Sequence, residues 1–306
     1  MAPAILAATD DGLREVPGGG AQLAGRRIVA LAAGLRALFA IADGREVFVS
    51  DGSSVWRSLC SLADADGRCL LATPDGLLVG TEGAHLARAS ERGIEPVDGF
   101  ESVAGRDRWF TPWGGPPATR SLSIGAEGEL YANVHVGGIP RSDDGGASWR
   151  PTIEIEVDAH EVRSPLERPR LILAATAYGL ATSSDGGGSW EVSDAGLEGR
   201  YSRAVALAGD IVLVTASDGP RGGHAAVYRR PLNASGPFER CRAGLPEWFD
   251  DNIDTGCLQA AGRLVAFGTA AGEVYASSDG GETWELASSG LPAVRSLLIV
   301  SGSRSG

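Results

Sequence analysis

Lysine is missing from this sequence. All 27 basic residues among its 306 are arginines, and 39 acidic residues bring the formal net charge to −12. Without lysine the chain cannot form the Schiff base of pyridoxal phosphate enzymes, and it cannot complete a P-loop for nucleotide phosphates. An acidic chain is also a poor partner for nucleic acid or for an anionic membrane surface. We therefore expect no pyridoxal phosphate, nucleotide, nucleic acid or membrane among its cofactors and partners.

Long apolar segments and targeting signals are missing as well. No run of 18 apolar residues occurs, and the N-terminal residues 1–6 contain no basic segment. A membrane-spanning helix needs about 20 apolar residues, and a secretory signal begins with a basic region. We expect a cytoplasmic protein, in which the four cysteines are free thiols.

Sustained helical periodicity is the third feature that the sequence lacks. The 44 glycines and 16 prolines separate short runs of four to seven residues rich in Val, Ile, Leu and Ala. Such runs, bounded by turn residues, are typical of β-strands. The sequence predicts an all-β protein.

A repeated motif, Ser-x-Asp-x-Gly-x-x-Trp, fixes the architecture. Three close copies occur at 142–149, 183–190 and 277–284, and a worn copy occurs at 49–56. Trp149 and Trp190 are 41 residues apart, which is one repeat. The other gaps are 93 residues, 94 residues and, through the termini, 78 residues, so each holds two repeats. Seven repeats of this length predict a seven-bladed β-propeller with four-stranded blades.

The two chain ends are expected to share one blade. The N-terminal residues match the second strand of another repeat, so the C-terminal strand would supply the missing first strand and close the ring. We expect a single domain over residues 1–300, followed by a disordered tail at 301–306. The predicted blades are 26–60, 67–103, 118–155, 158–194, 201–242 and 253–288, with blade seven formed by 3–25 and 294–300.

The motif resembles the Asp-box, or BNR repeat, of sialidase-like and sortilin-like β-propellers, a family that includes bacterial proteins labelled glycosyl hydrolases. In the predicted order, each copy forms a hairpin turn between a third and a fourth strand. Ser and Asp side chains would cap the turn, and glycine would supply positive φ. We expect a structural role for these residues: Asp51, Asp144, Asp185, Asp279, Trp56, Trp149, Trp190 and Trp284.

A second alignment places five arginines, one histidine and one glycine at the starts of the seven first strands, where a propeller's central channel opens. We call these seven the ring residues: Arg27, Arg68, Arg120, His160, Arg203, Gly256 and Arg295. Guanidinium groups bind carboxylate or phosphate in a bidentate manner, so this mouth suits an anionic ligand. In the alternative interpretation, each arginine forms an ion pair with a nearby acid and holds the blades together.

Three long loops are expected to open on the same face and to supply aromatic walls and polar groups. Large aromatic side chains on exposed loops favour a pocket, although they could also cover the channel. The candidate ligand-binding residues there are Trp109, Trp113, Trp248 and His224. His135, on the second strand of blade three, would join them.

Acid–base chemistry is the role we expect for His135, His160 and Asp254, because histidine titrates near neutral pH. The alternative is a divalent metal site formed by His135, His160, Asp158 and Glu161. The residues share no short ligand motif, so this alternative depends on the predicted topology alone.

The family resemblance implies two further possibilities. A sialidase uses an arginine triad, a tyrosine nucleophile and acidic partners, and Tyr201 would be the tyrosine. The sialidase Arg-Ile-Pro element is absent, and only Gly138-Ile-Pro-Arg141 is similar. The arginine-lined mouth also resembles the photosystem II assembly factor, which implies a non-catalytic protein-interaction scaffold.

The leading hypothesis is a monomeric propeller that binds a small anionic or polar ligand at the channel mouth and acts on it as a hydrolase or lyase. A protein- or peptide-binding scaffold and an exo-glycosidase of the sialidase type are the alternatives.

Overall fold

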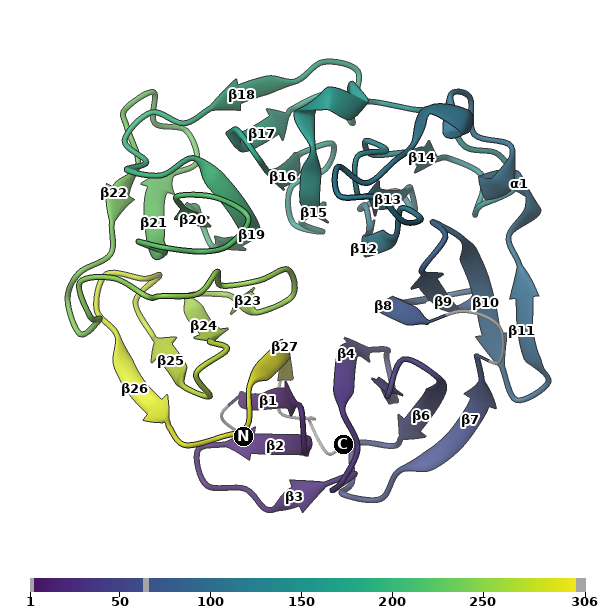
Figure 1. Ribbon diagram of the computed structural model, residues 1–306, viewed down its shortest axis with the longest axis horizontal. Helices are drawn as coiled ribbons and strands as arrows, with labels where there is room; N and C mark the ends of the chain where they lie inside the picture. Colours follow the sequence, from purple (N-terminus) through teal and green to yellow (C-terminus); the bar gives the residue numbers. More distant parts are fainter. Residues whose placement is uncertain (1–2, 63–65, 301–306) are drawn as a thin grey trace.

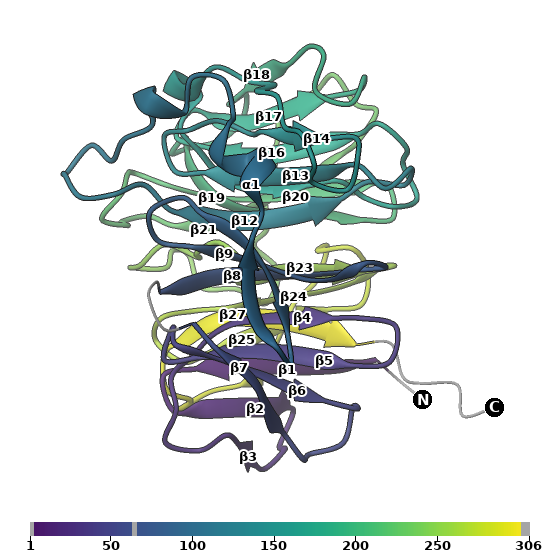
Figure 2. The same ribbon diagram turned by 90° about the vertical axis from the view of Figure 1, so that its right-hand side faces the viewer.

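The computed structural model describes residues 3–62 and 66–300 (Figure 1). Within them, seven antiparallel sheets are arranged in a ring around a central axis. Figure 2 shows the ring from the side, with β18 and β3 at opposite ends of the molecule. The predicted seven-bladed β-propeller is confirmed. The predicted tail at 301–306 lies outside the described residues.

One strand of each sheet faces the axis (Figure 1). In ring order these inner strands are β4 (Ile28–Ala33), β8 (Gly67–Thr73), β12 (Thr119–Ile124), β15 (Ala159–Arg163), β19 (Tyr201–Ala208), β23 (Leu258–Ala261) and β27 (Val294–Val300). The second strands are β5 (Leu38–Ala42), β9 (Gly76–Thr81), β13 (Leu130–Val134), β16 (Ile172–Thr176), β20 (Ile211–Ser217), β24 (Leu264–Gly268) and β1 (Ala4–Thr9).

The outer half of each blade is formed by shorter strands. The third strands are β6 (Glu46–Ser50), β10 (Leu86–Ser90), β14 (Arg141–Ser142), β17 (Gly179–Ser183), β21 (Ala226–Pro231), β25 (Val274–Ser277) and β2 (Gly12–Val16). The fourth strands are β7 (Arg57–Ser61), β11 (Gly93–Pro96), β18 (Glu191–Ser193), β22 (Glu239–Arg240), β26 (Glu285–Ser288) and β3 (Ala21–Gln22).

Blade three departs from this pattern at its outer edge. Its sheet has three strands, and a single bridge between Arg141 and Arg150 takes the place of a fourth. Three short helical turns lie in connections around blades two to four: α1 (Asp98–Glu101), η1 (Arg106–Arg108) and η2 (Ile155–Val157). No helix in the described residues is long and apolar enough to cross a membrane.

The ring is closed by its two ends, as predicted. β27 pairs with β1 over six residue pairs, from Ala4 opposite Val300 to Thr9 opposite Val294. Figure 1 shows this blade, in which the yellow C-terminal strand lies beside the purple N-terminal strands. The closure covers the edge of β1 that would otherwise be the open inner edge of this blade.

The hydrophobic core is divided among the interfaces between neighbouring blades. Between blades five and six, for example, Leu213 and Val227 pack with Phe267 and Trp284. Alanine is frequent on the second strands, where adjacent sheets approach closely. The four cysteines are unpaired and buried in this core, and burial raises the pKa of the Cys69 thiol to about 12.

The repeated motif forms tight turns after the third strands. In the copy at 183–190, the Ser183 hydroxyl donates to Asp185 Oδ1 at 2.9 Å and accepts from the N–H of Gly187 at 2.8 Å. Asp185 also accepts from the N–H and the hydroxyl of Ser189. The copies at 142–149 and 277–284 repeat this pattern. These aspartate carboxylates accept hydrogen bonds from groups within their own turns.

Candidate functional site

β-Bulges aim most of the ring residues at the channel mouth. In five inner strands the register against the second strand shifts near the strand start, and a ring residue lies at the shift without a register partner. These residues are Arg68, Arg120, His160, Arg203 and Arg295. In blade five Ala204 is skipped together with Arg203. A bulge bends its strand and redirects the extra side chain, which is why such shifts are common beside binding sites.

Two ring residues do not occupy this position. In blade one the unpaired residue is Val29, and Arg27 lies before the strand. In blade six β23 pairs without a shift, and Gly256 precedes it. The predicted alignment of Arg27 with the other arginines was therefore two residues out of register, because a bulge cannot be recognised from spacing alone.

In blades two and seven, the residue that follows the second strand neutralises the ring arginine. In several blades its N–H donates to the carbonyl just before the inner strand, as Asp10 does to Ala293 and Glu82 does to Asp66. Arg295 forms hydrogen bonds with Asp10 at 2.8 and 2.5 Å, and Arg68 pairs with Glu82. Arg27 also reaches Asp10, at 3.2 Å. For these three arginines, an acid beside the mouth offsets the charge.

His135 takes the place of this acid in blade three. Its N–H donates to Ala118 at 3.0 Å, as Glu82 does to Asp66. The sequence alignment matched His135 with the last residue of a second strand, but β13 ends one residue earlier, at Val134. His135 is thus the counterpart of Glu82.

Arg120 consequently has no carboxylate partner within residues 3–62 and 66–300. Its Nη1 is buried there and makes no hydrogen bond. Burial is the largest influence lowering the pKa of Arg120, followed by the positive charge of Arg203. A guanidinium nevertheless stays charged in a protein. The charges of Asp254 and Asp158 act on Arg120 from a distance, but neither carboxylate forms an ion pair with it among the described residues. Arg203, by contrast, lies 3.3 Å from Asp254.

A cavity of about 520 Å³ opens beside Arg120. We call it the mouth cavity; Trp113, Arg68, Arg120 and His135 are among the residues that line it. Two acids, Asp66 and Glu82, also line it, but each is paired with an arginine, Asp66 with Arg45 at 2.6 Å and Glu82 with Arg68. Trp113 is 62% exposed, and its ring centre lies 4.9 Å from that of His135.

The other predicted wall residues lie elsewhere. Trp109 is buried against Phe100, with Arg106 over its ring. Trp248 lies beneath Arg240 and beside His224, whose Nδ1 is 2.7 Å from Asp218. None of these residues lines the mouth cavity. The large rings of Trp109 and Trp248 pack against apolar and cationic side chains within the fold.

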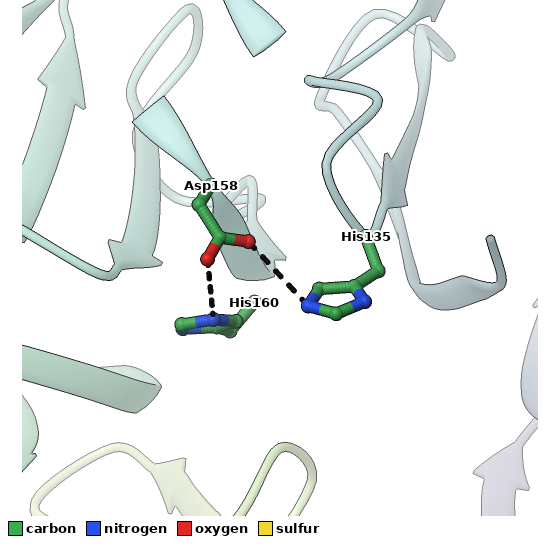
Figure 3. A group of neighbouring side chains, drawn as sticks. All are labelled: His135, Asp158 and His160. Atoms are coloured by element: carbon green, nitrogen blue, oxygen red, sulfur yellow. Dashed lines mark ion pairs between the residues drawn. The ribbon is translucent and has the colours of Figure 1, made fainter. Parts of the chain in front are cut away.

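Three polar side chains meet next to Arg120, and we call them the His–Asp–His cluster: His135, Asp158 and His160 (Figure 3). His135 follows β13, Asp158 precedes β15, and His160 is the bulge residue of β15. His135 Nε2 lies 3.5 Å from Asp158 Oδ1, and His160 Nε2 lies 3.6 Å from Asp158 Oδ2. Both distances exceed the usual hydrogen-bond range.

Buried atoms of this cluster lack partners. Nε2 of both histidines and Oδ1 of Asp158 are enclosed without a hydrogen bond in the part of the chain that the structure describes. The histidine side chains are 1% and 0% exposed. His160 Nδ1 lies 2.6 Å from the carbonyl oxygen of Ser202, so Nδ1 carries the proton. Its Nε2 then presents a lone pair to Asp158.

The electrostatics of the cluster favour neutral histidine beside a charged carboxylate. Burial, reinforced by Arg120, lowers the pKa of His135 to about 4. For Asp158, burial is the largest influence and acts to raise the pKa, but its contacts with the two histidines and Arg120 lower the pKa overall. At neutral pH the carboxylate of Asp158 therefore carries its negative charge beside a neutral His135.

The backbone is strained on both sides of the cluster. Asp158 has φ of 50° and Val136, next to His135, has φ of 46°. Positive φ is rare for residues other than glycine and is an outlier for a β-branched one such as valine. These conformations hold the side chains in place and are often found at functional sites.

The remaining candidates for acid–base or metal chemistry do not join the cluster. Buried Glu161 accepts from the N–H groups of Val205 at 3.0 Å and Gly256 at 3.2 Å, and it pairs with Arg163 at 2.6 Å. Its carboxylate is thus occupied between blades. Asp254 is half-exposed beside Arg203. Only three of the four predicted metal ligands come together, because the Glu161 carboxylate is held by Val205, Gly256 and Arg163 instead.

Comparison with known proteins identifies the fold. No family model and no curated protein matches the chain. Among solved structures, an ancestral GH74 enzyme superimposes with a TM-score of 0.65 at 15% identity, over 93% of this chain and 40% of the enzyme. The chain thus spans less than half of that enzyme's length. The RRP9 WD40 repeats give a TM-score of 0.63 at 16% identity, with 95% and 86% coverage. YCF48 bound to D1 peptide gives 0.59 at 15%, with 90% and 93% coverage.

These neighbours include both enzymes and non-catalytic scaffolds. At such low identity they show the propeller fold and nothing finer, because one fold supports many functions.

Proposed function

We propose that this protein binds a small anionic ligand in the mouth cavity. The observation that carries the proposal is that Arg120 forms no ion pair among the described residues: His135 stands where blades two and seven place an acid, and Arg120 lines the cavity with a buried Nη1 that makes no hydrogen bond. A carboxylate or phosphate group would supply the missing charge and acceptors in bidentate geometry.

The size and walls of the cavity support this proposal. Its volume of about 520 Å³ falls within the range typical of small-molecule sites. Trp113 offers an exposed apolar face, and His135 adds a polar group close to it. Because Asp66 and Glu82 are already paired with arginines, they repel an incoming anion less than free carboxylates would.

Titration calorimetry with inorganic phosphate, citrate and glucuronate as probes tests the proposal. We expect Arg120→Gln to weaken binding of the preferred probe about 10- to 100-fold, since a hydrogen-bonded charge contributes about 1.5–3 kcal/mol. Arg295→Gln is the matched control, because Arg295 is already paired with Asp10. Equal effects of both substitutions, or no binding of any probe by the wild type, would refute the proposal.

The second candidate function is hydrolysis or elimination of the bound ligand, which the His–Asp–His cluster favours. His135 is neutral at pH 7 and lines the cavity, so it could accept a proton from a ligand. A sialidase-type reaction has less support. Tyr201 is buried between His160 and Arg203, and burial raises the pKa of a hydroxyl that would have to act as the nucleophile.

A peptide carboxyl terminus would present the same anionic chemistry. YCF48 was solved with a peptide bound, which gives this scaffold function a precedent on the same fold. Binding of a peptide with a free carboxyl end, but not of its amidated form or of the small probes, would favour the scaffold. We further propose that the chain is an Asp-box protein and a cytoplasmic monomer; the repeated motif turns and the unpaired cysteines support these assignments.

A further inference from the structure

We propose that His135, Asp158 and His160 bind one divalent transition-metal ion. Two imidazole Nε2 atoms and a carboxylate oxygen face one another with no hydrogen bond in residues 3–62 and 66–300, and both histidines are almost fully buried. Burying unpartnered polar atoms is costly, and a bound cation would satisfy all three. This inference does not depend on the anion proposed above.

The distances between the three ligand groups suit a metal ion. Two donors placed about 2.1 Å from a tetrahedral ion lie about 3.4 Å apart. The nitrogen–oxygen distances here are 3.5 Å from His135 to Asp158 Oδ1 and 3.6 Å from His160 to Asp158 Oδ2, so each histidine faces one oxygen of the carboxylate. With one ligand atom taken from each residue, the three atoms lie within 4.8 Å of one another. The nitrogen–oxygen distances are too long for hydrogen bonds and close to the spacing that a shared ion imposes.

The hydrogen bond at Nδ1 of His160 also supports a bound metal ion. Its Nδ1–H donates to the Ser202 carbonyl, so Nε2 directs a lone pair at Asp158. Metal-binding histidines typically donate their other N–H to a carbonyl or carboxylate in this manner. A lone pair facing a carboxylate is repulsive unless a cation or proton lies between them.

The two other histidines show what a proton-sharing pair looks like in this protein. His85 Nδ1 lies 2.8 Å from Glu101, and His224 Nδ1 lies 2.7 Å from Asp218. Both pairs are exposed and have ordinary hydrogen-bond lengths. The buried cluster differs from them in distance, burial and number of nitrogen ligands.

Two histidines and one carboxylate suit zinc or ferrous iron, and three protein ligands leave at least one position for water or another oxygen ligand. His135 lines the mouth cavity, so an oxygen of the anionic ligand could occupy that position.

The test uses the full-length protein without an affinity tag, stripped with a chelator and titrated with zinc chloride by calorimetry, with elemental analysis of the reloaded protein. We expect about one zinc ion per chain in the wild type. His135→Ala and the near-isosteric Asp158→Asn should each weaken zinc binding by at least about 100-fold. His85→Ala, which changes a histidine outside the cluster, is the matched control and should retain wild-type affinity.

Wild-type protein that binds no zinc and no ferrous iron would overturn the inference, and this result does not depend on whether any variant folds. Retention of full affinity in correctly folded Asp158→Asn, as judged by circular dichroism, would also overturn it. Arg120→Gln separates the two proposals, because it should lose the anion while keeping the metal.

Discussion

In blades two, three and seven, the side chain that follows the second strand influences the charge at the channel mouth. Asp10 forms an ion pair with Arg295, and Glu82 forms one with Arg68. Each ion pair joins two parts of the same blade. His135 is neutral, so Arg120 has no ion-pair partner at this position in the part of the chain that the structure describes. Blade three has His135 at the position where blades two and seven have an acid. Arg120 therefore has no ion-pair partner there among the described residues, and the His–Asp–His cluster gains one of its two histidines.

Asp144 should give the protein a measurable sensitivity to acid. Hydrogen bonds from Ser148 are the main reason that its pKa falls from 3.8 to about 2. A carboxylate with a lowered folded-state pKa stabilises the fold fully above pH 3.8 and loses this contribution as the pH falls through 2. The wild type should therefore unfold at a higher temperature than Asp144→Asn at pH 6, and the difference should shrink towards pH 2.

Melting temperatures measured by circular dichroism between pH 6 and pH 2 check this prediction. Asp107→Asn, at an exposed aspartate in η1, is the control and should follow the wild type. A difference between wild type and Asp144→Asn that stays constant over the whole range would contradict the role given to the turn.

At the level of strands, β-bulges organise the candidate site. They leave Arg68, Arg120, His160, Arg203 and Arg295 unpaired at equivalent places, so the five side chains reach the mouth from five different blades. His160 is the bulge residue of β15 and lies two residues after Asp158, whose backbone has a positive φ just before the strand begins. Regular pleating alone would not define that arrangement.

The tryptophans of the motif turns should differ in their contribution to stability. Trp284 is buried, donates from Nε1 to Gly281 at 3.1 Å and packs edge-on against Phe267. Trp190 is only half-buried. We expect Trp284→Ala to cost about 3–5 kcal/mol and Trp190→Ala clearly less. Chemical unfolding of both variants beside the wild type measures this, and equal losses would contradict the prediction.

Much of this element-level structure could be predicted from the sequence. Tryptophan spacing gave the number of blades, because a motif in a fixed turn recurs once per blade, and the matching strand segments gave the ring closure. The bulges and the place of His135 could not be predicted, because shifts of one residue depend on three-dimensional pairing. Trp109 and Trp248 were expected at the pocket, but residue type alone does not distinguish a pocket wall from a core residue.

Over the whole molecule, net charge and local charge differ. The chain carries 12 more acidic than basic residues, yet the mouth cavity contains Arg120 without a paired acid among the described residues. The acids that line the cavity are each matched by an arginine. An acidic protein can thus attract an anion at one site while repelling it elsewhere.

Closure of the ring should govern the stability and monomeric behaviour of the whole propeller. β27 contributes buried Val294 and Leu297 and covers β1 over six residue pairs. A chain ending at Ala293 would lose several kcal/mol of apolar burial and would expose the inner edge of β1 to other molecules. We expect this truncation to lower the melting temperature and to cause concentration-dependent self-association in size-exclusion chromatography, whereas a control chain ending at Val300 should remain monomeric. A truncated chain that stays monomeric and melts with the control would show that the other six blades are stable without closure.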